Sequence, residues 1–481
     1  MLFNSLDFAI FLPIVFALYW LLRQRLTLQN LLIVVASYLF YAFWDWRFLS
    51  LLLFSTLTDY IIGICLGKEK NPKRRKAWLW GSISVNLGFL FIFKYFNFFI
   101  DNFATAFTFF GADIQGHSLN IILPIGISFY TFQTLSYTID IYYKKLEPTR
   151  DFLSFAAFVS FFPQLVAGPI ERATNFLPQF FTKRTFDPAF ANEGLRQMLW
   201  GFFKKMVIAD GCAKYANMIF ENAGDYSGSA LLLGAFFFAF QIYGDFSGYS
   251  DIAIGCAKLF GFNLKRNFAY PYFSRDIAEF WKRWHISLST WFRDYLYIPL
   301  GGSRGTLLKV IRNTFIIFMV SGLWHGASWT FLIWGTLNAL YFLPLLLKKK
   351  TKRYTDIVAK GKRLPSFKEC CSMLITFTLT LLAWIFFRAE SVGDAMLYIS
   401  GIFSKSLFAM PNYPELFASA IVLLTVVVFV IIEWFGREEE YAIAGIGKIK
   451  SGIMRWILYY IIVMAIFLFA GKSADFIYFQ F

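Results

Sequence analysis

One stretch decides how the chain folds: NTFIIFMVSGLWHGASWTFLIWGTLNALYFLPLLL, residues 313–347, which are 35 residues without an Asp, Glu, Lys or Arg. A single helix of that length is about 52 Å long at 1.5 Å per residue, whereas the hydrocarbon core of a bilayer is about 30 Å thick. Arg312 and Lys348 flank the stretch, and both are expected on the cytoplasmic side. We therefore predict that the segment enters the membrane and turns back. Glycines 322 and 326 are the expected breaks, with His325 at a turn deep within the protein.

The composition of the whole chain is that of an integral membrane protein. Of its 481 residues 58% are hydrophobic and only 16% are charged, which excludes an ordinary soluble domain. Apolar stretches recur at the length that spans a bilayer, so we predict an all-α protein with about ten transmembrane helices plus re-entrant and interfacial helices. The first stretch, 6–22, lacks a basic leader and is expected to stay in the mature protein. The short stretch 152–168 contains Pro163 and Gly168, which predicts a half-span or a re-entrant piece.

Net charge and cysteine spacing argue against two other classes of function. The formal net charge is +16, but Lys and Arg cluster beside the apolar stretches. The positive-inside rule and anionic lipid explain that clustering, so nucleic acid is not expected as a partner. The five cysteines lack metal-ligand spacing, and no metal site is expected.

The distribution of Lys and Arg predicts which loops face the cytoplasm. Residues 67–77 contain six Lys or Arg against one Glu, and residues 348–363 contain eight against one Asp, so both loops are expected inside. Counting crossings from these loops places 142–150 inside and 100–120 outside. The tail 471–481 then lies outside, which predicts a multi-pass protein with an extracytoplasmic C-terminus.

His325 is the strongest candidate for a functional side chain. An ionisable group at membrane depth is costly and usually faces a water-lined cavity or a partner. A neutral imidazole can also take a proton near pH 7. The alternative is a hydrogen-bonded structural histidine. His117 falls in an outside loop and is expected to be a surface residue.

Residues 274–298 show helical periodicity, with aromatic and aliphatic side chains on one face and charged side chains on the other. This pattern predicts an amphipathic helix in the cytoplasmic interface, with Ser274 as its N-cap. His285 falls at the edge of the apolar face. From this position the imidazole either points into the protein or lies in the interface without a functional role.

The segment QIYGDFSGYSDIAIG, 241–255, carries Asp245, Ser247, Tyr249, Ser250 and Asp251 in an otherwise apolar span. Polar groups at this depth line a cavity or pair internally. Packing alone does not meet the cost of burying the two carboxylates, so they need partners, with Arg or Tyr the candidates. Gly244 and Gly248 have the spacing of a close helix contact.

Four stretches together resemble the membrane-bound O-acyltransferase (MBOAT) superfamily, and in particular its alginate O-acetyltransferase-like bacterial branch. They are FFPQLVAGPI at 161–170, YGDFSGYSD at 243–251, FWKRWHISLSTWFRDYLYIPLGG at 280–302 and SGLWHGASW at 321–329. The resemblance runs over the whole chain and implies one transmembrane domain, 1–481, around a central funnel or tunnel. Its parts are N-terminal spans in 1–120, a catalytic core at about 121–347, C-terminal spans in 370–470 and the tail 471–481.

The resemblance also implies roles for particular residues. His325 matches the catalytic histidine, and His285 matches a second position occupied by Asn or His. Acyl transfer from a thioester to a hydroxyl needs a base and donors for the oxyanion, so His325 is the predicted general base. His285 is predicted to orient the acyl donor or to polarise the reaction site, and a purely architectural role is the alternative. The predicted funnel-lining or supporting residues are Tyr243, Asp245, Ser247, Tyr249, Asp251 and Trp324.

Acetyl-CoA is the implied acyl donor, bound from the cytoplasm as a substrate, and no resident cofactor is expected. Cations suit the phosphates of CoA. The candidate contacts are Arg172, Lys204, Lys205, Lys282 and Arg283, and positive-inside charge is the competing explanation for each.

The chain ends in DFIYFQF, residues 475–481. This end resembles the F-x-Y-x-x-F ending of the same branch at Phe476, Tyr478 and Phe481. Aromatic side chains exposed at a terminus indicate docking, and a frayed or lipid-seated tail is the alternative. The Tyr478 phenol is a candidate carrier of the acyl group between His325 and a second enzyme.

Together these features predict an O-acetyltransferase of the bacterial cytoplasmic (inner) membrane, surrounded by membrane lipid. It is expected to move an acetyl group from cytoplasmic acetyl-CoA to an extracytoplasmic hydroxyl, for O-acetylation of a surface polysaccharide such as alginate. The implied partner is a periplasmic SGNH-hydrolase-like acetyltransferase. Two alternatives stay open: D-alanyl transfer from a carrier-protein thioester to a cell-wall polymer, and a non-catalytic transporter or flippase.

Overall fold

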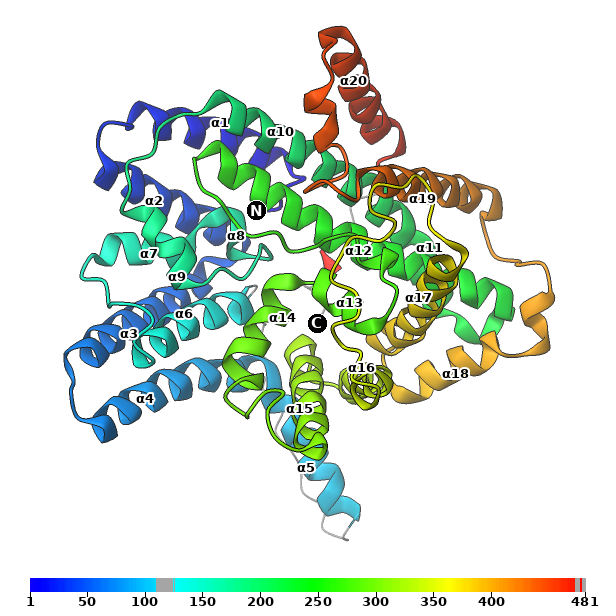
Figure 1. The fold of residues 1–481 in the computed structure, drawn as a ribbon, viewed down its shortest axis with the longest axis horizontal. Coiled ribbons are helices and arrows are strands. Elements are labelled where there is room, and N and C mark those ends of the chain that lie inside the picture. The colour runs from blue at the N-terminus through cyan, green and yellow to red at the C-terminus, as the bar shows by residue number, and fades with distance from the viewer. Residues whose placement is uncertain (110–123, 125, 472–475, 478–481) are drawn as a thin grey trace. The chain divides into compact units, whose positions relative to one another are not determined.

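The computed structural model describes residues 1–109, 124, 126–471 and 476–477. Every regular element among these residues is a helix (Figure 1), which confirms the predicted all-α class. The chain divides into two units, 1–188 with 259–264 and 189–258 with 265–481. His117, Tyr478 and Phe481 lie outside the described residues.

The helices of the first unit pack around a buried polar network. Asp59 accepts hydrogen bonds from Ser82 at 2.6 Å and from Asn86 at 2.8 Å, and the Ser82 hydroxyl lies 2.9 Å from that of Thr138. These contacts join α3, α4 and α6. The helices are α1 (Leu6–Leu21), α2 (Leu26–Asp45), α3 (Leu49–Lys68), α4 (Pro72–Leu90), α5 (Phe96–Phe109), α6 (Ile127–Tyr142), α7 (Phe152–Ser160), α8 (Phe162–Leu165) and α9 (Ala173–Phe176).

The stretch 152–168 forms two short helices, α7 and α8, rather than one span. The helix breaks at Phe161, and Pro163 lies in the first turn of α8, where its missing N–H leaves no helical hydrogen bond unmade. The interruption predicted around this proline is therefore present.

The second unit contains the three polar segments identified in the sequence. Its helices are α10 (Pro188–Phe203), α11 (Asp210–Glu221), α12 (Gly228–Leu259), α13 (Ile277–Arg283), α14 (Ile286–Phe292), α15 (Leu307–His325), α16 (Trp329–Leu347), α17 (Phe367–Arg388), α18 (Val392–Ile402), α19 (Leu416–Gly436) and α20 (Gly452–Phe469). A π-helical turn, Lys204–Ala209, joins α10 to α11.

Helix α12 packs closely against α10 and the π-helical turn through glycines. A Cβ on Gly244 would lie 2.9 Å from the carbonyl oxygen of Lys204, and one on Gly248 would lie 2.8 Å from that of Gly201. Both distances are too short for a real Cβ. The predicted close contact at this G-x-x-x-G is therefore present.

The prediction of a single helix over 274–298 is wrong. Helices α13 and α14 are separate, because His285 between them has a left-handed backbone with φ 42° and ψ 57°. The N-cap of α13 is Asp276, whose side chain accepts from the Glu279 N–H at 2.8 Å, and not Ser274.

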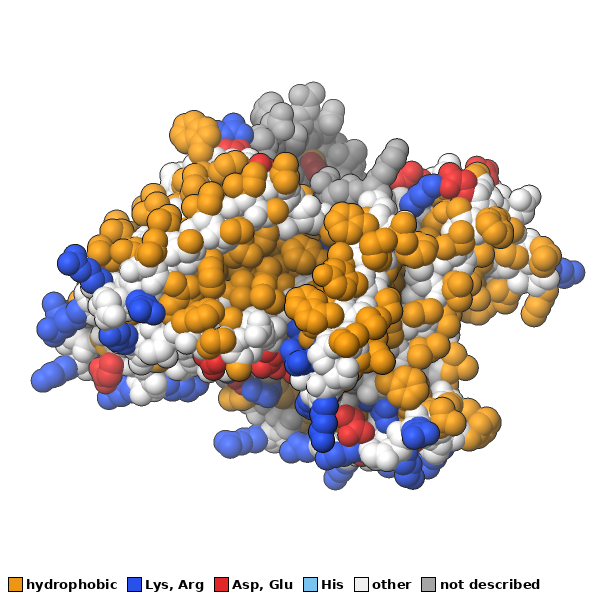
Figure 2. All heavy atoms as spheres, turned by 90° about the horizontal axis from the view of Figure 1, so that it is seen from above, with side chains coloured by type: hydrophobic (Ala, Val, Ile, Leu, Met, Phe, Trp, Pro, Cys, Tyr) orange, Lys and Arg blue, Asp and Glu red, His pale blue; other side chains and the backbone are white. Residues whose placement is uncertain are grey.

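Eight segments of the described chain are long and apolar enough to cross a membrane, which confirms a multi-span protein. One of them, Leu26–Lys68, contains two 20-residue helices, α2 and α3, which accounts for part of the difference from the ten predicted crossings. Hydrophobic side chains cover most of the face in Figure 2, and Lys and Arg gather along its lower edge.

Candidate functional site

The hairpin of α15 and α16 places His325 at a turn. His325 is the last residue of α15, and the chain leaves the helix at Gly326 in an extended conformation. Ser328 then caps α16 by accepting from the Thr330 N–H, and the two helices lie side by side (Figure 1). The turn-back is therefore confirmed, with the break at Gly326. Gly322 stays inside α15, where a Cβ would overlap the carbonyl oxygen of Phe331 on α16.

Three aromatic rings enclose the imidazole of His325, which is 4% exposed. Its ring centroid lies 4.9 Å from that of Trp324, 5.0 Å from Trp334 and 5.1 Å from Phe387, with interplanar angles of 70° to 82°. Edge-to-face contacts of this kind favour one ring orientation. Helices α15, α16 and α17 each supply one of these rings.

His285 is held by Asn267, which lies in the loop before α13. The Nδ1 atom of His285 is 3.1 Å from Oδ1 of Asn267. The backbone N–H of Ser287 also points to Oδ1, at 3.2 Å, and since an N–H only donates, this atom is the amide oxygen. His285 Nδ1 therefore carries the proton, and in the neutral ring Nε2 has the lone pair.

The protonation state of His285 follows from its burial. The residue is 1% exposed, and burial lowers its pKa to about 3, because the charged imidazolium is disfavoured away from water. His285 is therefore neutral at physiological pH, and Nε2 is a hydrogen-bond acceptor.

The left-handed backbone at His285 is a strained conformation for a residue with a Cβ. Two backbone hydrogen bonds hold it in place: Ile286 N–H to the Asn267 carbonyl at 2.8 Å, and Ala269 N–H to the Arg283 carbonyl at 2.9 Å. The segment around Asn267 thus fixes both the backbone and the imidazole of His285.

Trp324 brings the two histidines together. Its ring centroid lies 6.0 Å from that of His285 and 4.9 Å from that of His325. One indole therefore contacts both imidazoles, although 40 residues separate them in the chain. Sequence spacing alone gave no indication of this contact.

The two carboxylates of the α12 polar segment have lysine partners. Asp245 pairs with Lys205 at 2.8 Å, and Asp251 pairs with Lys204 at 2.5 Å. Gln197 also donates to Asp251 at 2.9 Å. The need for partners is thus met, although by lysines rather than by the Arg or Tyr considered from the sequence.

The hydroxyl groups of α12 make further contacts within the second unit. Tyr243 donates to Glu433 of α19 at 2.8 Å, and the Ser247 hydroxyl donates to the carbonyl of Tyr243 at 2.6 Å. Ser250 accepts from the Asn267 side-chain amide at 3.1 Å. This last contact links α12 to the residue that orients His285.

The predicted phosphate contacts have other partners in the structure. Lys204 and Lys205 are 3% and 8% exposed and form the internal ion pairs just described, which differs from a role at a cytoplasmic surface. Arg283 pairs with Glu279 at 2.8 Å, and Lys282 donates to two backbone carbonyls of the loop that follows α16. Arg172 is half-buried in the first unit, ahead of α9.

The described part of the C-terminal tail reaches the same polar segment of α12. Phe476 and Ile477 are 2% and 1% exposed. The Phe476 ring lies 4.8 Å from that of Tyr249 and 6.2 Å from that of Phe246, and the Ile477 N–H donates to Asp245 at 2.7 Å.

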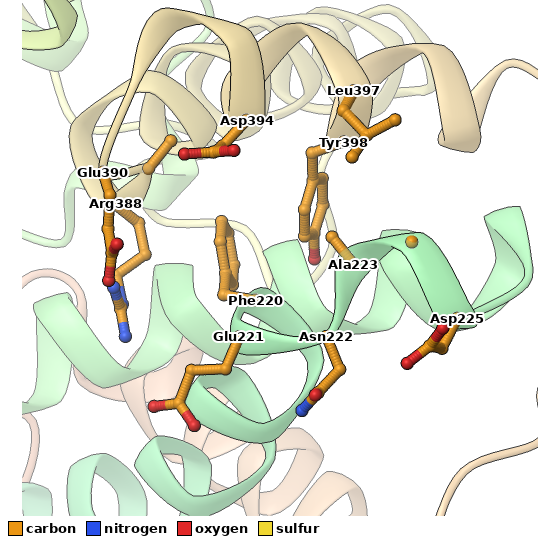
Figure 3. Close-up of a pocket in the computed structure, with 12 residues that line it drawn as sticks. Phe220, Glu221, Asn222, Ala223, Asp225, Arg388, Glu390, Asp394, Leu397 and Tyr398 are labelled. Carbon is orange, nitrogen blue, oxygen red and sulfur yellow. The ribbon is translucent and has the colours of Figure 1, made fainter.

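The predicted funnel or tunnel stays a prediction. A pocket of about 270 Å³ is lined by Trp281, Lys282 and Ser321 among others. Of these, Ser321 lies on α15, one helical turn before His325. A second pocket, of about 410 Å³, lies where α11 and α17 end and α18 begins (Figure 3). Its lining includes Glu221, Arg388, Asp394 and Tyr398 and none of the predicted site residues.

Sequence reasoning missed several residues of this site. Glu433 lies in the apolar run IVLLTVVVFVIIEWF, residues 421–435, so the rule that flagged Asp245 could have found it. Asn267 lies in a polar loop segment and gives no comparable signal. Trp334 and Phe387 are two of many aromatic residues in apolar helices, and only their place against His325 distinguishes them.

Comparison with known proteins gives a consistent result. Residues 39–364 match the model of the family described as MBOAT, membrane-bound O-acyltransferase, a range that includes α12, His285 and His325. The chain is 38% identical over 458 residues to the probable alginate O-acetylase of Azotobacter vinelandii, covering 94% of this chain and 88% of that protein. It is 35% identical over 435 residues to the peptidoglycan O-acetyltransferase of Helicobacter pylori, covering 84% and 80%. Identity to the teichoic acid D-alanyltransferase of Streptococcus thermophilus is 30% over 290 residues, covering 55% and 68%.

Proposed function

This chain belongs to the membrane-bound O-acyltransferase family and is a membrane O-acetyltransferase, and we propose that it transfers an acetyl group from cytoplasmic acetyl-CoA to an extracytoplasmic hydroxyl group. The final acceptor in this proposal is a cell-surface polysaccharide. The relatives that match most of the chain are named for O-acetylation of alginate and of peptidoglycan, which supports this class of acceptor.

The observation that supports the proposal most strongly is the contact of His285 and His325 with the same indole, that of Trp324. A transferase needs one group that takes the proton of the hydroxyl and another that orients the donor. His325, at the end of α15, is the general base in this proposal. His285, neutral and with its lone pair on Nε2, is the orienting group.

The reaction balances with these two residues. The hydroxyl oxygen attacks the thioester carbonyl carbon while His325 takes the hydroxyl proton, so the C–O bond forms. The tetrahedral intermediate then collapses, the C–S bond breaks, and the CoA thiolate leaves with the proton from the His325 imidazolium. The pantetheine arm of CoA contains amide N–H groups, which match the acceptor at His285 Nε2.

The tail supports acetyl transfer with a carrier step. Tyr478 follows Ile477 directly in the chain, and Ile477 is bound to α12 near the Phe246 ring that contacts His285. In the proposal the Tyr478 phenol receives the acetyl group as an ester. A periplasmic SGNH-hydrolase-like acetyltransferase then moves that group to the polysaccharide.

D-alanyl transfer is the second candidate, and the teichoic acid D-alanyltransferase match favours it. That match covers only 55% of this chain, however, against 94% for the alginate relative. A carrier-protein thioester that replaces acetyl-CoA as donor would identify D-alanyl transfer.

The proposal is tested with purified protein in detergent and acetyl-CoA labelled in the acetyl group. We expect thioester cleavage to fall about 10²- to 10⁴-fold in His325→Ala, the range for loss of a general base, while the thermal unfolding midpoint shows that the variant is folded. In cells, Tyr478→Phe should abolish surface acetyl esters. Thioester cleavage that survives in His325→Ala contradicts the role of His325, and unchanged surface esters in Tyr478→Phe contradict the carrier step.

A further inference from the structure

The described part of the tail is bound to the second unit at two points. The N–H of Gly471 donates to the carbonyl of Met206 at 3.1 Å, within the π-helical turn that follows α10. The N–H of Ile477 donates to Oδ2 of Asp245 at 2.7 Å. Phe476 and Ile477 are almost fully buried, so these two residues are inserted into the unit rather than lying on its surface.

The acceptor for Ile477 is itself held rigidly. Oδ1 of Asp245 pairs with Nζ of Lys205 at 2.8 Å, and Lys205 pairs with Asp210 at 2.9 Å. The side chains of Lys205 and Asp245 are 10% and 2% exposed, so water screens this pair little. Asp245 thus uses one oxygen for the lysine and the other for the tail.

The carboxylate of Asp245 is well suited to bind the backbone N–H of Ile477. A carboxylate makes a shorter and stronger hydrogen bond to a backbone N–H than a neutral carbonyl does. A backbone contact also fixes the path of the chain without depending on the side chain of Ile477. The Asp245 carboxylate, held by Lys205, can therefore fix the backbone of Ile477 in the tail.

The bound residues lie next to the candidate site. The Phe246 ring lies 6.2 Å from that of Phe476 and 4.6 Å from the imidazole of His285, at 88° to it. One phenylalanine ring therefore separates the inserted tail from His285.

We infer that Asp245, fixed by Lys205, is a positioning residue that seats the C-terminal tail beside His285. The inference deepens the proposed function and rests on it for the reason why the tail is seated. Asp245 acts through the tail and takes no part in proton transfer.

Three variants separate seating from general stability. Asp245→Asn cannot serve both neighbours, because its one oxygen accepts from either Lys205 or Ile477 while its NH₂ group faces the other donor. Adding Lys205→Gln removes this conflict: the Gln oxygen accepts from the Asn amide, and the Gln amide donates to Asp210. Asp251→Asn is the matched control, since it removes the charge that forms the neighbouring ion pair with Lys204 and keeps an oxygen that accepts from Gln197.

The readout is trimming of the purified, full-length protein by a carboxypeptidase, followed by intact mass. In the wild type, trimming should slow at Ile477. In Asp245→Asn, removal of Ile477 and Phe476 should be about tenfold faster, the effect of losing one hydrogen bond to a charged group. The double variant should return to the wild-type rate, and Asp251→Asn should keep it. Equal trimming rates in Asp245→Asn and the wild type, or equal acceleration in Asp251→Asn, would overturn the inference.

Surface ester content separates this inference from the proposed function. Asp245→Asn should lower the esters about tenfold, and the double variant should restore them. If the tail is released in Asp245→Asn while the esters stay at the wild-type level, the seating stands and the proposed role of the tail fails. If the wild type does not cleave acetyl-CoA, the proposed function fails, and trimming still decides the seating.

Discussion

The hydrogen-bond partners of His285 fix the tautomer and the orientation of its imidazole. Asn267 Oδ1 receives the backbone N–H and the hydroxyl of Ser287 together with His285 Nδ1–H. An amide oxygen only accepts hydrogen bonds, so the tautomer of His285 that fits is the one with its proton on Nδ1. His285, predicted at the edge of an amphipathic helix, is therefore a buried residue whose imidazole has a fixed orientation, with Nε2 as the acceptor.

The low pKa of His285 predicts a dependence of stability on pH. Its pKa is about 3 in the folded protein and about 6.5 in an unfolded chain. Between these values the unfolded state binds more protons, so stability falls as the pH falls below 6.5. At pH 5 this amounts to on the order of 2 kcal/mol.

We expect His285→Gln to lose this part of the acid sensitivity, because Gln does not titrate while its amide can still donate to Asn267. The measurement is the thermal unfolding midpoint in detergent at pH 7.5 and at pH 5 for both proteins. An equal fall in the midpoint for the two proteins would show that His285 is already charged, or is exposed, in the folded state.

At the scale of elements, the α15–α16 hairpin fixes the position of His325. The helices approach closely because Gly322 faces the Phe331 carbonyl and Gly335 faces that of Phe318. Trp334 of α16 packs on His325 only while this approach is kept. The spacing between α15 and α16 therefore determines the position of the His325 ring.

Gly322→Ala should force α15 and α16 apart and move His325. We expect a loss of about 1–3 kcal/mol, as for other overpacked contacts, together with a lower rate of thioester cleavage. Gly211→Ala in α11 is the matched control, because its Cβ would lie 3.5 Å from Val422, an ordinary contact. Thermal midpoints and cleavage rates of the two variants decide the matter, and a Gly322→Ala protein that behaves like Gly211→Ala would refute the tight contact.

At the scale of the whole molecule, charge predicts the orientation in the membrane. The eight Lys and Arg of residues 348–363 predict a cytoplasmic loop. Helix α17 then crosses outward, so the segment between α18 and α19 faces outside. In the proposed function, this orientation decides from which side the donor acetyl-CoA and the acceptor hydroxyl reach the histidines.

This orientation predicts which cysteines react in intact spheroplasts. In a variant whose five cysteines are replaced by serine, Lys360→Cys should react with a membrane-impermeant maleimide only after lysis. Phe408→Cys, at a position that is 90% exposed between α18 and α19, should react in both samples. The opposite pattern would invert the orientation and with it the proposed direction of transfer.

The sequence by itself determined the class of protein, the hairpin and the candidate histidine. Within a bilayer each segment must satisfy its own backbone hydrogen bonds, so the length of an apolar run and its breaks are local properties. The same reasoning showed that Asp245 and Asp251 need partners, because the cost of burying a carboxylate does not depend on the fold.

The tertiary structure alone decided which residues meet. The break between α13 and α14, the pairing of each aspartate with a particular lysine and the contact of Trp324 with both histidines depend on packing between distant segments. Ile477 and Asp245 are 232 residues apart in the chain. No local pattern encodes such a contact, since its free energy arises only when the helices that form the surrounding surface are already in place.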